Sequence, residues 1–410
     1  MPMDSHPPAG FAAAEHADAA GDYRDLLLSG LQTPTVARIN LAALRQNIEV
    51  IRSYIAPQVQ LLAMIKANAY GHGMLAVARE AEAAGVGYFG IARIEEGIEL
   101  RRAGFQQRVL LLELAAGERA VAAIRLDLEI TVASLDQAVV LSDLAGRLGL
   151  TARIHVEVDT GMGRIGVHHR EAAQTVRDIT RLPNLELAGV FSHFASSDDP
   201  DQAFAREQLQ RFNAVLGELE RLGVRVPLRH FANSGAVMTL PEAHFDLVRV
   251  GIMLYGYAPS GSLKADGLAP VMSLQSQVSY LKSVEGGTPI SYDRRYIAPR
   301  KTRIATVLAG YGDGYSRSLT NNAEVLIRGR RYPVVGTICM DMIMVDVGPD
   351  SDVSLGDSVT LIGQEGNERI TAWELARRQG TIPYEITCQI AERVPRVVLS
   401  QTVPRTPPIV

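Results

Sequence analysis

Eight apolar segments alternate with helix-like segments in this chain, and this alternation restricts the possible folds more than any other feature. The apolar segments lie near residues 61–65, 87–92, 108–112, 128–132, 152–158, 186–192, 228–232 and 247–252. Continuous apolar runs are typical of parallel strands that are buried on both faces. The pattern predicts an α/β fold, a (β/α)₈ TIM-type barrel, although an open doubly wound sheet would show a similar alternation.

A different pattern begins after about residue 265. Short β-rich segments occur at 273–284, 303–308, 324–327, 332–338, 342–347 and 358–362, with glycine turns between them and one helix around 372–378. Closely spaced strands of this kind predict a mainly antiparallel β domain. We expect a mobile extension at 1–33, the barrel at 34–265, the β domain at 266–399 and an extended tail at 400–410. A strand at 36–39 can join the β domain instead of the barrel.

Composition narrows the class of protein. The chain has 410 residues, a net charge of −4 and 47% apolar residues, so no basic field points to nucleic acid or an anionic membrane. No apolar run approaches the roughly 18 residues of a spanning helix. The first 33 residues lack the features of a signal peptide. Two cysteines, Cys339 and Cys388, favour a reducing cytoplasm, although a single disulfide stays open.

Lys66 closes the apolar segment 61–65 and precedes Asn68, Gly71 and Gly73. A lysine at the end of a buried strand has its stem in apolar surroundings, and desolvation then lowers the pKa of its amine. Free amine is available to form a Schiff base. The alternative is an ordinary surface lysine. The position at the strand end and the glycines that follow favour the Schiff-base lysine.

Polar side chains follow the ends of several predicted strands, where a parallel barrel forms its active site. These ends contain neither a pair of catalytic carboxylates nor the spacing of a metal site. The segment 161–166 matches G-x-G-x-x-G, but it follows the fifth strand and no acid closes a strand at the required distance, so a dinucleotide site is disfavoured. The strand-end residues are Lys66 and Tyr70, Asp159 to Arg164, Ser192 and His193, Asn233 to Gly235, and Arg249 with Gly251.

Two of these strand ends suit a phosphate group. The segments 233–235 and 250–252 combine small side chains with free backbone N–H groups, and phosphate sites of barrels often follow the late strands. Each alone would be an ordinary turn. Together with a Schiff-base lysine, they indicate pyridoxal 5'-phosphate, which offers an aldehyde to the lysine and a phosphate to the loops.

Further motifs extend over roughly residues 34–399. They are found at 66–73, 159–164, 192–195, 232–234, 249–252, 255–256, 310–315, 338–341, 384–385 and 393–396. In residue type and order these segments closely resemble the bacterial alanine racemases, which carry pyridoxal phosphate on a barrel followed by a β domain. The resemblance implies an isomerase that interconverts L- and D-alanine and supplies D-alanine for peptidoglycan. It also implies a cytoplasmic homodimer with shared active sites.

The resemblance implies two catalytic bases on opposite faces of the substrate. Lys66 is one, and Tyr296, which lies 19 residues before Tyr315 as in the family, is the other and comes from the partner subunit. Without the resemblance, Tyr296 would be interpreted as a tyrosine on a strand surface. Arg249 is expected to face the pyridine nitrogen. Because arginine only donates, the ring nitrogen stays unprotonated, which suits racemisation better than transamination.

The resemblance assigns the remaining site residues as well. His193 is expected to pack on the ring, Arg164 to bind the ring oxygen and the substrate carboxylate, and Met340 to receive that carboxylate through its backbone. Tyr315 is expected to narrow the entrance. The residues expected to hold the phosphate are Tyr70, Ser234, Gly251, Ile252 and Tyr384, with Asn233 nearby.

One position departs from the family. Many members have a carbamylated lysine two residues before the Asp-Thr-Gly segment, and this chain has Glu157. We hypothesise that the Glu157 carboxylate replaces the carbamate as the acceptor for Arg164. The alternative is that Glu157 only lines the barrel, but an unpaired buried carboxylate is costly.

Other functions stay open at this stage. A decarboxylase of basic amino acids would be expected to have a carboxylate instead of Arg249 at the ring nitrogen. A carrier that binds pyridoxal phosphate without catalysis would be expected to lack the second domain. Racemisation of serine, or a broader specificity, also remains possible.

Overall fold

The computed structural model describes residues 33–264 and 266–399. The expected extension at 1–33, apart from Thr33, and the expected tail at 400–410 lie outside the described residues. The elements below belong to one compact unit that begins at Thr35. Among the described residues, no helix combines the length and the apolar character that crossing a membrane requires.

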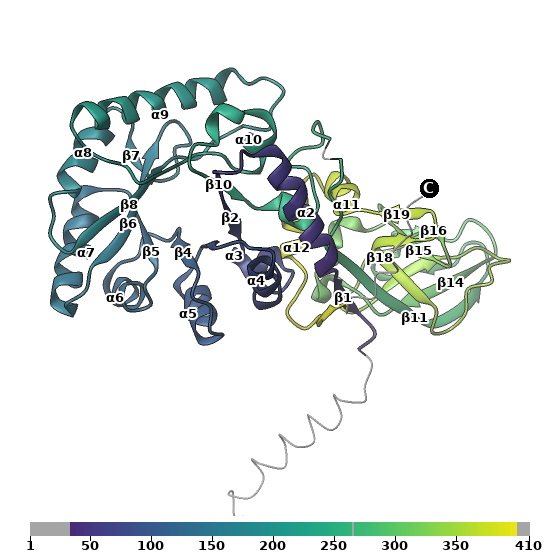
Figure 1. Ribbon diagram of the computed structural model, residues 1–410. Helices are drawn as coiled ribbons and strands as arrows, with labels where there is room; N and C mark the ends of the chain where they lie inside the picture. Colours follow the sequence, from purple (N-terminus) through teal and green to yellow (C-terminus); the bar gives the residue numbers. More distant parts are fainter. Residues whose placement is uncertain (1–32, 265, 400–410) are drawn as a thin grey trace, which may run out of the picture. The chain divides into compact units, whose positions relative to one another are not determined.

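Eight parallel strands form a nearly closed barrel (Figure 1). The two strands at the ends of the ladder are joined by backbone bonds from Asp246 N to Arg229 O (3.0 Å) and from Arg249 N to Ala232 O (2.9 Å). The barrel prediction is therefore confirmed, and the open doubly wound sheet is excluded. In spatial order the strands are β10 (Leu247–Val250), β2 (Gln60–Met64), β3 (Tyr88–Ile91), β4 (Arg108–Leu111), β5 (Glu129–Val132), β6 (Ala152–Asp159), β8 (Leu185–Phe191) and β9 (Leu228–His230), and the short β7 (Val167–His168) pairs with β6.

Helical segments alternate with these strands, as the apolar spacing predicted. Strand β3 is buried at every position, which explains why its sequence is a continuous apolar run instead of an alternation. Strand β5 is equally buried, although it contains the polar residues Glu129 and Thr131. The helices between the strands are α3 (Lys66–Tyr70), α4 (Met74–Ala83), α5 (Ile94–Arg102), α6 (Gly117–Arg125), α7 (Leu135–Leu148), α8 (Ala172–Ile179), α9 (Ala203–Arg221) and α10 (Ser234–Thr239).

The other strands form a second, mainly antiparallel sheet, which confirms the predicted β domain. The long strand β11 (Met272–Val284) pairs antiparallel with β1 (Val36–Ile39), β14 (Thr302–Val307) and β18 (Ser358–Glu365). The sheet also contains β15 (Glu324–Ile327), β16 (Arg330–Pro333), β17 (Ile343–Asp346), β19 (Glu368–Ile370) and β20 (Arg396–Val398). A separate hairpin joins β12 (Pro289–Ile290) to β13 (Tyr296–Ile297), and the helices are α11 (Ala372–Gln379) and α12 (Pro383–Cys388).

Strand β1 connects this sheet to the barrel. It lies between β11 and β20, and it pairs with β20 in parallel. The chain then enters α2 (Leu41–Tyr54), whose start is capped by Asn40, because its Oδ1 accepts from Ala43 N at 3.1 Å. The first and last strands of the described chain, β1 and β20, are therefore neighbours in the sheet of the β domain. The strand at 36–39 belongs to this domain although it precedes the barrel in sequence.

A left-handed turn carries Lys66 between β2 and α4. Residues 67–70 all have φ values of 52° or 53°, although none of them is glycine. Left-handed backbone costs a non-glycine residue roughly 1–2 kcal/mol. Part of this cost is offset by a hydrogen bond to a charged group, because Ala67 donates its N–H to Glu96 Oε1 at 2.6 Å. The turn is held in this form by its surroundings and not by its own residue preferences.

Substitution of Ala67 by glycine should test this strain. We expect Ala67→Gly to raise the free energy of unfolding by about 0.5–1 kcal/mol, because glycine adopts positive φ without steric cost. The matched control is Ala214→Gly on the exposed face of α9, which should instead cost about 1 kcal/mol. Chemical denaturation of the two variants measures both effects. Equal losses in both variants would contradict the strained turn.

Candidate active site

The carboxyl ends of the barrel strands surround a cavity of about 350 Å³. Loops at this end of a barrel form its active site. The structure brings together here all the residues that the sequence predicted for cofactor binding. They are Lys66, Tyr70, Arg164, His193, Asn233, Ser234, Arg249, Gly251, Ile252 and Tyr384.

The amine of Lys66 lies in a partly desolvated, positively charged environment. Burial, together with the charges of Arg164 and Arg249, lowers the pKa of this amine, and Glu96 acts in the opposite direction. A lower pKa increases the fraction of free amine at neutral pH. The amine can therefore act as a nucleophile toward a carbonyl group and as a base.

One wall of the cavity is rich in hydrogen-bond donors. Burial raises the pKa of the Tyr70 and Tyr384 hydroxyls, so both keep their protons. A Cβ at Gly251 would lie 2.5 Å from the Tyr70 hydroxyl oxygen, so only glycine allows this close approach. Gly251 N also donates to Ser234 Oγ at 3.0 Å. Hydroxyl and backbone donors of this kind suit a phosphate group, and a Schiff-base lysine suits its aldehyde, so the residues present fit pyridoxal phosphate.

Helix α12 brings part of the β domain against the turn that carries Lys66. Tyr384 and Cys388 of this helix line the cavity. A Cβ at Gly71 would lie only 2.1 Å from Thr387 O, so the two backbones are in direct contact. The turn is also bonded to the end of the described chain, because Arg396 Nε donates to Gly71 O at 2.9 Å. The β domain therefore completes a site that the barrel strands begin.

Arg249 is buried beneath the cavity, with only 4% of its surface exposed. Burial lowers the pKa of its guanidinium to about 10, so it stays charged at neutral pH, and Glu157 acts in the opposite direction. Its Nη atoms donate to Ser192 O at 2.8 Å and to the Nδ1 atoms of His193 and His230 at 3.0 Å each. Burial lowers the pKa of both histidines, so these acceptors are neutral. The guanidinium thus remains an obligatory donor at this edge of the cavity.

Glu157 occupies the position at which the sequence departs from its family. It is 3% exposed, and its Oε1 lies 3.9 Å from Arg164 Nη2. This distance is too long for a hydrogen bond, so the hypothesis that Arg164 donates to Glu157 requires the half-exposed arginine to move closer. Burial raises the pKa of Glu157 to about 7, although Arg249 and Arg164 both act to lower it.

Three predicted residues do not line the cavity. Met340 is 53% exposed on the β domain. Tyr315 is 2% exposed. Tyr296 is half-buried, and its hydroxyl donates to Asp346 Oδ2 at 2.9 Å. Burial, the bond to Asp346 and its negative charge raise the pKa of Tyr296 to about 12, which makes its hydroxyl a poorer base. The internal positions of Tyr296 and Tyr315 argue against the roles predicted for them.

The sequence reasoning missed a second pair of tyrosines with the same spacing. Tyr292 lies 19 residues before Tyr311, as Tyr296 does before Tyr315. Tyr292 is 68% exposed and Tyr311 is 43% exposed. Ser291 and Asp293, on either side of Tyr292, have positive φ values of 65° and 58°, so the ring is presented on a strained turn. Only burial distinguishes the two pairs, and burial cannot be seen from the spacing.

Other residues of the site also escaped the sequence reasoning. Leu112, Phe191 and Cys388 line the cavity. Leu112 and Phe191 belong to apolar runs and resemble ordinary core residues. Glu96 supports the turn at Lys66. Its place in the first turn of α5 is the third position of a capping box, and its Oε2 accepts from Arg93 N at 3.1 Å. This position is the signal by which the sequence could have identified Glu96.

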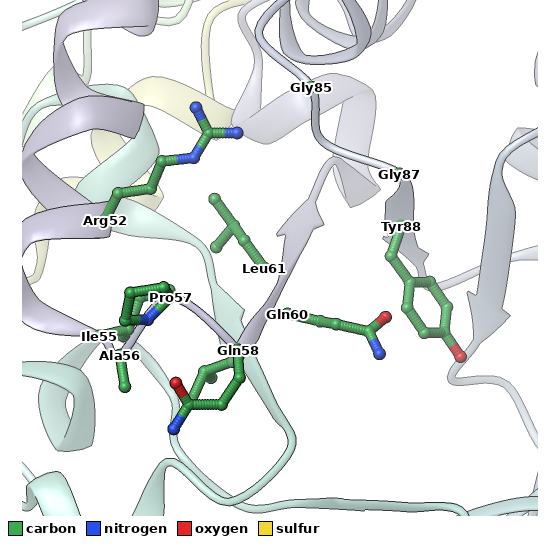
Figure 2. Close-up of a pocket in the computed structure, with 11 residues that line it drawn as sticks. Arg52, Ile55, Ala56, Pro57, Gln58, Gln60, Leu61, Gly85, Gly87 and Tyr88 are labelled. Carbon is green, nitrogen blue, oxygen red and sulfur yellow. The ribbon is translucent and has the colours of Figure 1, made fainter.

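A second cavity, of about 630 Å³, lies at the opposite end of the barrel (Figure 2). It is lined by Arg52, by residues 55–61 before and at the start of β2, and by Gly85, Gly87 and Tyr88 around the start of β3. Residues at the amino ends of barrel strands serve stability, whereas catalytic residues lie at the carboxyl ends. We therefore place the reaction in the smaller cavity, which contains the amine, the two arginines and the hydroxyl donors.

Glu157 should make the stability of the apoprotein depend on pH. Its folded pKa of about 7 lies above the ordinary value of 4.5, so stability present at low pH is lost as the pH rises through 7. Between about pH 5 and pH 8, the wild type should lose about 2–3 kcal/mol of unfolding free energy relative to Glu157→Gln. Urea denaturation measures this, with Glu118→Gln at an exposed position as the control for one lost charge. A difference that does not change with pH would contradict a buried, titrating Glu157.

Profiles of known families match both parts of the chain. The profile described as "Alanine racemase, N-terminal domain" matches residues 39–259, and "Alanine racemase, C-terminal domain" matches residues 271–398. These two ranges correspond to the barrel and to the β domain.

Curated relatives and solved structures agree with the profiles. The chain is 46% identical to an alanine racemase of Geobacter sulfurreducens, covering 90% of this chain and 98% of the relative. It is 44% identical to an alanine racemase of Symbiobacterium thermophilum, covering 92% and 99%. A solved alanine racemase of Clostridium difficile 630 is 38% identical, with a TM-score of 0.86, and covers 90% of this chain and 96% of that chain. The chain therefore belongs to the alanine racemase family, a family of isomerases.

Proposed function

We propose that this protein interconverts L- and D-alanine with pyridoxal 5'-phosphate, as a homodimer, and that the D-alanine supplies peptidoglycan. The observation that carries the proposal is the convergence of Lys66, Arg164, Arg249 and a set of hydroxyl donors on one cavity in a member of this family. When bound, the cofactor withdraws electrons from the substrate's Cα and makes its proton acidic.

Within this proposal, Lys66 holds the cofactor and moves a proton at one face of Cα. Its lowered pKa supports both roles, because an uncharged amine is needed for each. Tyr70, Ser234, Gly251, Ile252 and Tyr384 bind the phosphate, and His193 packs on the ring.

Arg249 and Arg164 have different functions in the proposal. Arg249 faces the ring nitrogen as a donor and keeps it unprotonated, since a guanidinium does not release its proton. This limits how strongly the ring withdraws electrons, and it favours return of the proton over side reactions. Arg164 is half-exposed in the cavity and binds the substrate carboxylate.

The second base comes from the other subunit in this proposal, and we revise its identity from Tyr296 to Tyr292. The exposure of Tyr292 supports this choice, because a side chain that serves a partner's site must project from its own subunit. Met340 and Tyr311 are exposed beside each other, since Tyr311 N donates to Cys339 O and Gly312 N donates to Met340 O. Ser291, next to Tyr292, lies 3.6 Å from Cys339 Sγ through its own Oγ, which connects the turn of Tyr292 to this segment. We propose that Tyr292, Tyr311 and Met340 together face the partner's cavity.

Proton exchange at Cα tests the reaction. In deuterated water, the protein with pyridoxal phosphate should convert L-alanine into D-alanine with deuterium at Cα, and should act on L-serine much more slowly. Lys66→Ala should abolish both. Carbon dioxide released from lysine or ornithine would identify a decarboxylase instead, and a bound cofactor without turnover would identify a carrier.

The same assay separates the two tyrosines. Tyr292→Phe should lower the racemisation rate by about 100-fold or more, since general acid–base catalysis contributes roughly 10²–10⁴. Lys66 should still exchange the α-proton of one enantiomer, because one face keeps its base. The matched control, Tyr296→Phe, should keep most of the activity. A large loss in Tyr296→Phe with none in Tyr292→Phe would restore the first assignment.

Mixing two inactive variants tests the shared site. Lys66→Ala and Tyr292→Phe should each be inactive alone, but subunit exchange at equal amounts should restore about a quarter of wild-type activity, because half of the symmetric dimers then contain one intact site of two. The control is a mixture of Lys66→Ala with the double variant, which should regain nothing. No recovery in the first mixture, with exchange shown by mass spectrometry, would place both bases in one subunit.

A further inference from the structure

A chain of hydrogen-bonded polar side chains extends through the barrel interior, from the amino ends of the strands to Arg249. Glu129, His155 and His230 each have 0% of their surface exposed. Glu129 starts β5, His155 lies in the middle of β6, and His230 ends β9. The chain thus connects the two ends of the barrel without contact with solvent.

Glu129 lies at the end of this series of hydrogen bonds that is opposite to Arg249, and it accepts hydrogen bonds there. Its Oε1 accepts from Arg108 Nε at 2.6 Å. Its Oε2 accepts from the Tyr88 hydroxyl and lies 2.8 Å from His155 Nε2. Burial alone would raise the pKa of Glu129, but the hydrogen bonds from His155, Arg108 and Tyr88 hold it below its usual value. Arg153 lies 3.9 Å from Oε1 and adds a further positive charge. Glu129 is therefore ionised and can only accept.

This acceptor decides which nitrogen of each histidine carries the proton. The Tyr88 hydroxyl lies 3.0 Å from His155 Nε2 as well, but it donates its proton to Glu129. His155 Nε2 must therefore itself donate to Glu129. Burial lowers the pKa of His155 and keeps the ring neutral, so its Nδ1 is a bare acceptor. His155 Nδ1 lies 2.9 Å from His230 Nε2, which must then carry a proton. His230 Nδ1 is left bare, and it lies 3.0 Å from Arg249 Nη1. With neutral rings, the opposite arrangement would place two N–H donors against each other at Arg249.

The barrel is built around these rings. A Cβ at Gly189 would lie 2.5 Å from His155 Nδ1, so only glycine leaves room for the ring at this position of β8. The ring of Phe191 stacks on His230, with centroids 4.8 Å apart and planes 9° apart. The side chains therefore cannot turn freely to exchange their ring nitrogens.

We infer that Glu129 is a positioning residue for the reaction: through His155 and His230 it keeps His230 Nδ1 unprotonated, and so provides the acceptor that holds Arg249 in the cavity. The inference rests on the proposed function only for its effect on catalysis. Arg249 in turn donates to His193 Nδ1 at 3.0 Å. His193 therefore carries its proton on Nε2, the ring nitrogen that Arg249 does not contact. If Glu129 only neutralised Arg108, the proton positions on His230 would not depend on it.

The direct test is nitrogen-15 NMR of the full-length protein with labelled histidine, since protonated and bare ring nitrogens have well-separated shifts. His155→Gln and His230→Gln assign the two rings. In the wild type, both rings should carry their proton on Nε2 alone. A proton on Nδ1 of His230 in the wild type would overturn the inference without any further variant.

Glu129→Gln should reverse the direction of the hydrogen bonds between residue 129, His155 and His230. Arg108 only donates, so the oxygen of the introduced amide must face it, and the amide NH₂ group then faces His155. The proton should move to Nδ1 in both His155 and His230, and Arg249 should lose an acceptor. The control is Glu80→Gln. Glu80 is a buried carboxylate on the outside of the barrel that pairs with Arg45 at 2.6 Å. Its replacement should leave the proton positions on both histidine rings unchanged. Unchanged rings in Glu129→Gln would overturn the inference.

The catalytic effect is measured separately. Glu129→Gln should lower kcat for alanine racemisation by about tenfold, the effect of one lost hydrogen bond to a charged group, with little change in KM. Glu80→Gln should leave kcat unchanged. An altered ring protonation with unchanged kcat would overturn the positioning role. If the wild type does not racemise alanine, the proposed function fails. The NMR result still decides whether Glu129 sets the proton positions on His155 and His230.

Discussion

The buried guanidinium of Arg249 is the constraint on which the rest of the site depends. A group that cannot release its proton must find acceptors inside the barrel, and unpaired burial of such a charge would be very costly. The barrel supplies the carbonyl oxygens of Ser192, His230 and Phe231 and two neutral imidazoles, but no carboxylate bonds the guanidinium among the described residues. Glu157 acts on this positive charge without bonding it, and the charge in turn acts to lower the pKa of Lys66. In the proposed function, this one buried charge influences both the cofactor ring and the amine of Lys66.

Local strain and tertiary contact are balanced around Lys66. The left-handed turn at 67–70 would not form in an isolated peptide, because each residue has an unfavourable φ. It persists because Glu96 binds its backbone and because α12 packs directly against Gly71. The geometry of the Lys66 turn in the barrel therefore depends on a helix of the other domain. This explains how a β domain, which contributes few cavity residues, is an integral part of the site.

Much of this architecture could be predicted from the order of residues. Strands β2 to β6 lie at the apolar runs that predicted them. The strand at 36–39 could be predicted to join the β domain, but its partners β11 and β20 could not, because they lie more than 200 positions away in the sequence. The choice between Tyr292 and Tyr296 was also undetermined. Both fit a 19-residue spacing, and only the bond from Tyr296 to Asp346 shows which hydroxyl is held internally.

By itself, the sequence determined the succession of strands and helices, the lysine at a strand end and the small-residue loops for a phosphate, because these are local patterns of polarity and size. Only the tertiary structure decided that the barrel closes, that α12 completes the cavity, and that Glu129 connects to Arg249 through two histidines. Burial and proton sharing arise between residues far apart in the chain. No spacing along the sequence encodes them, so they become visible only when the strands are assembled.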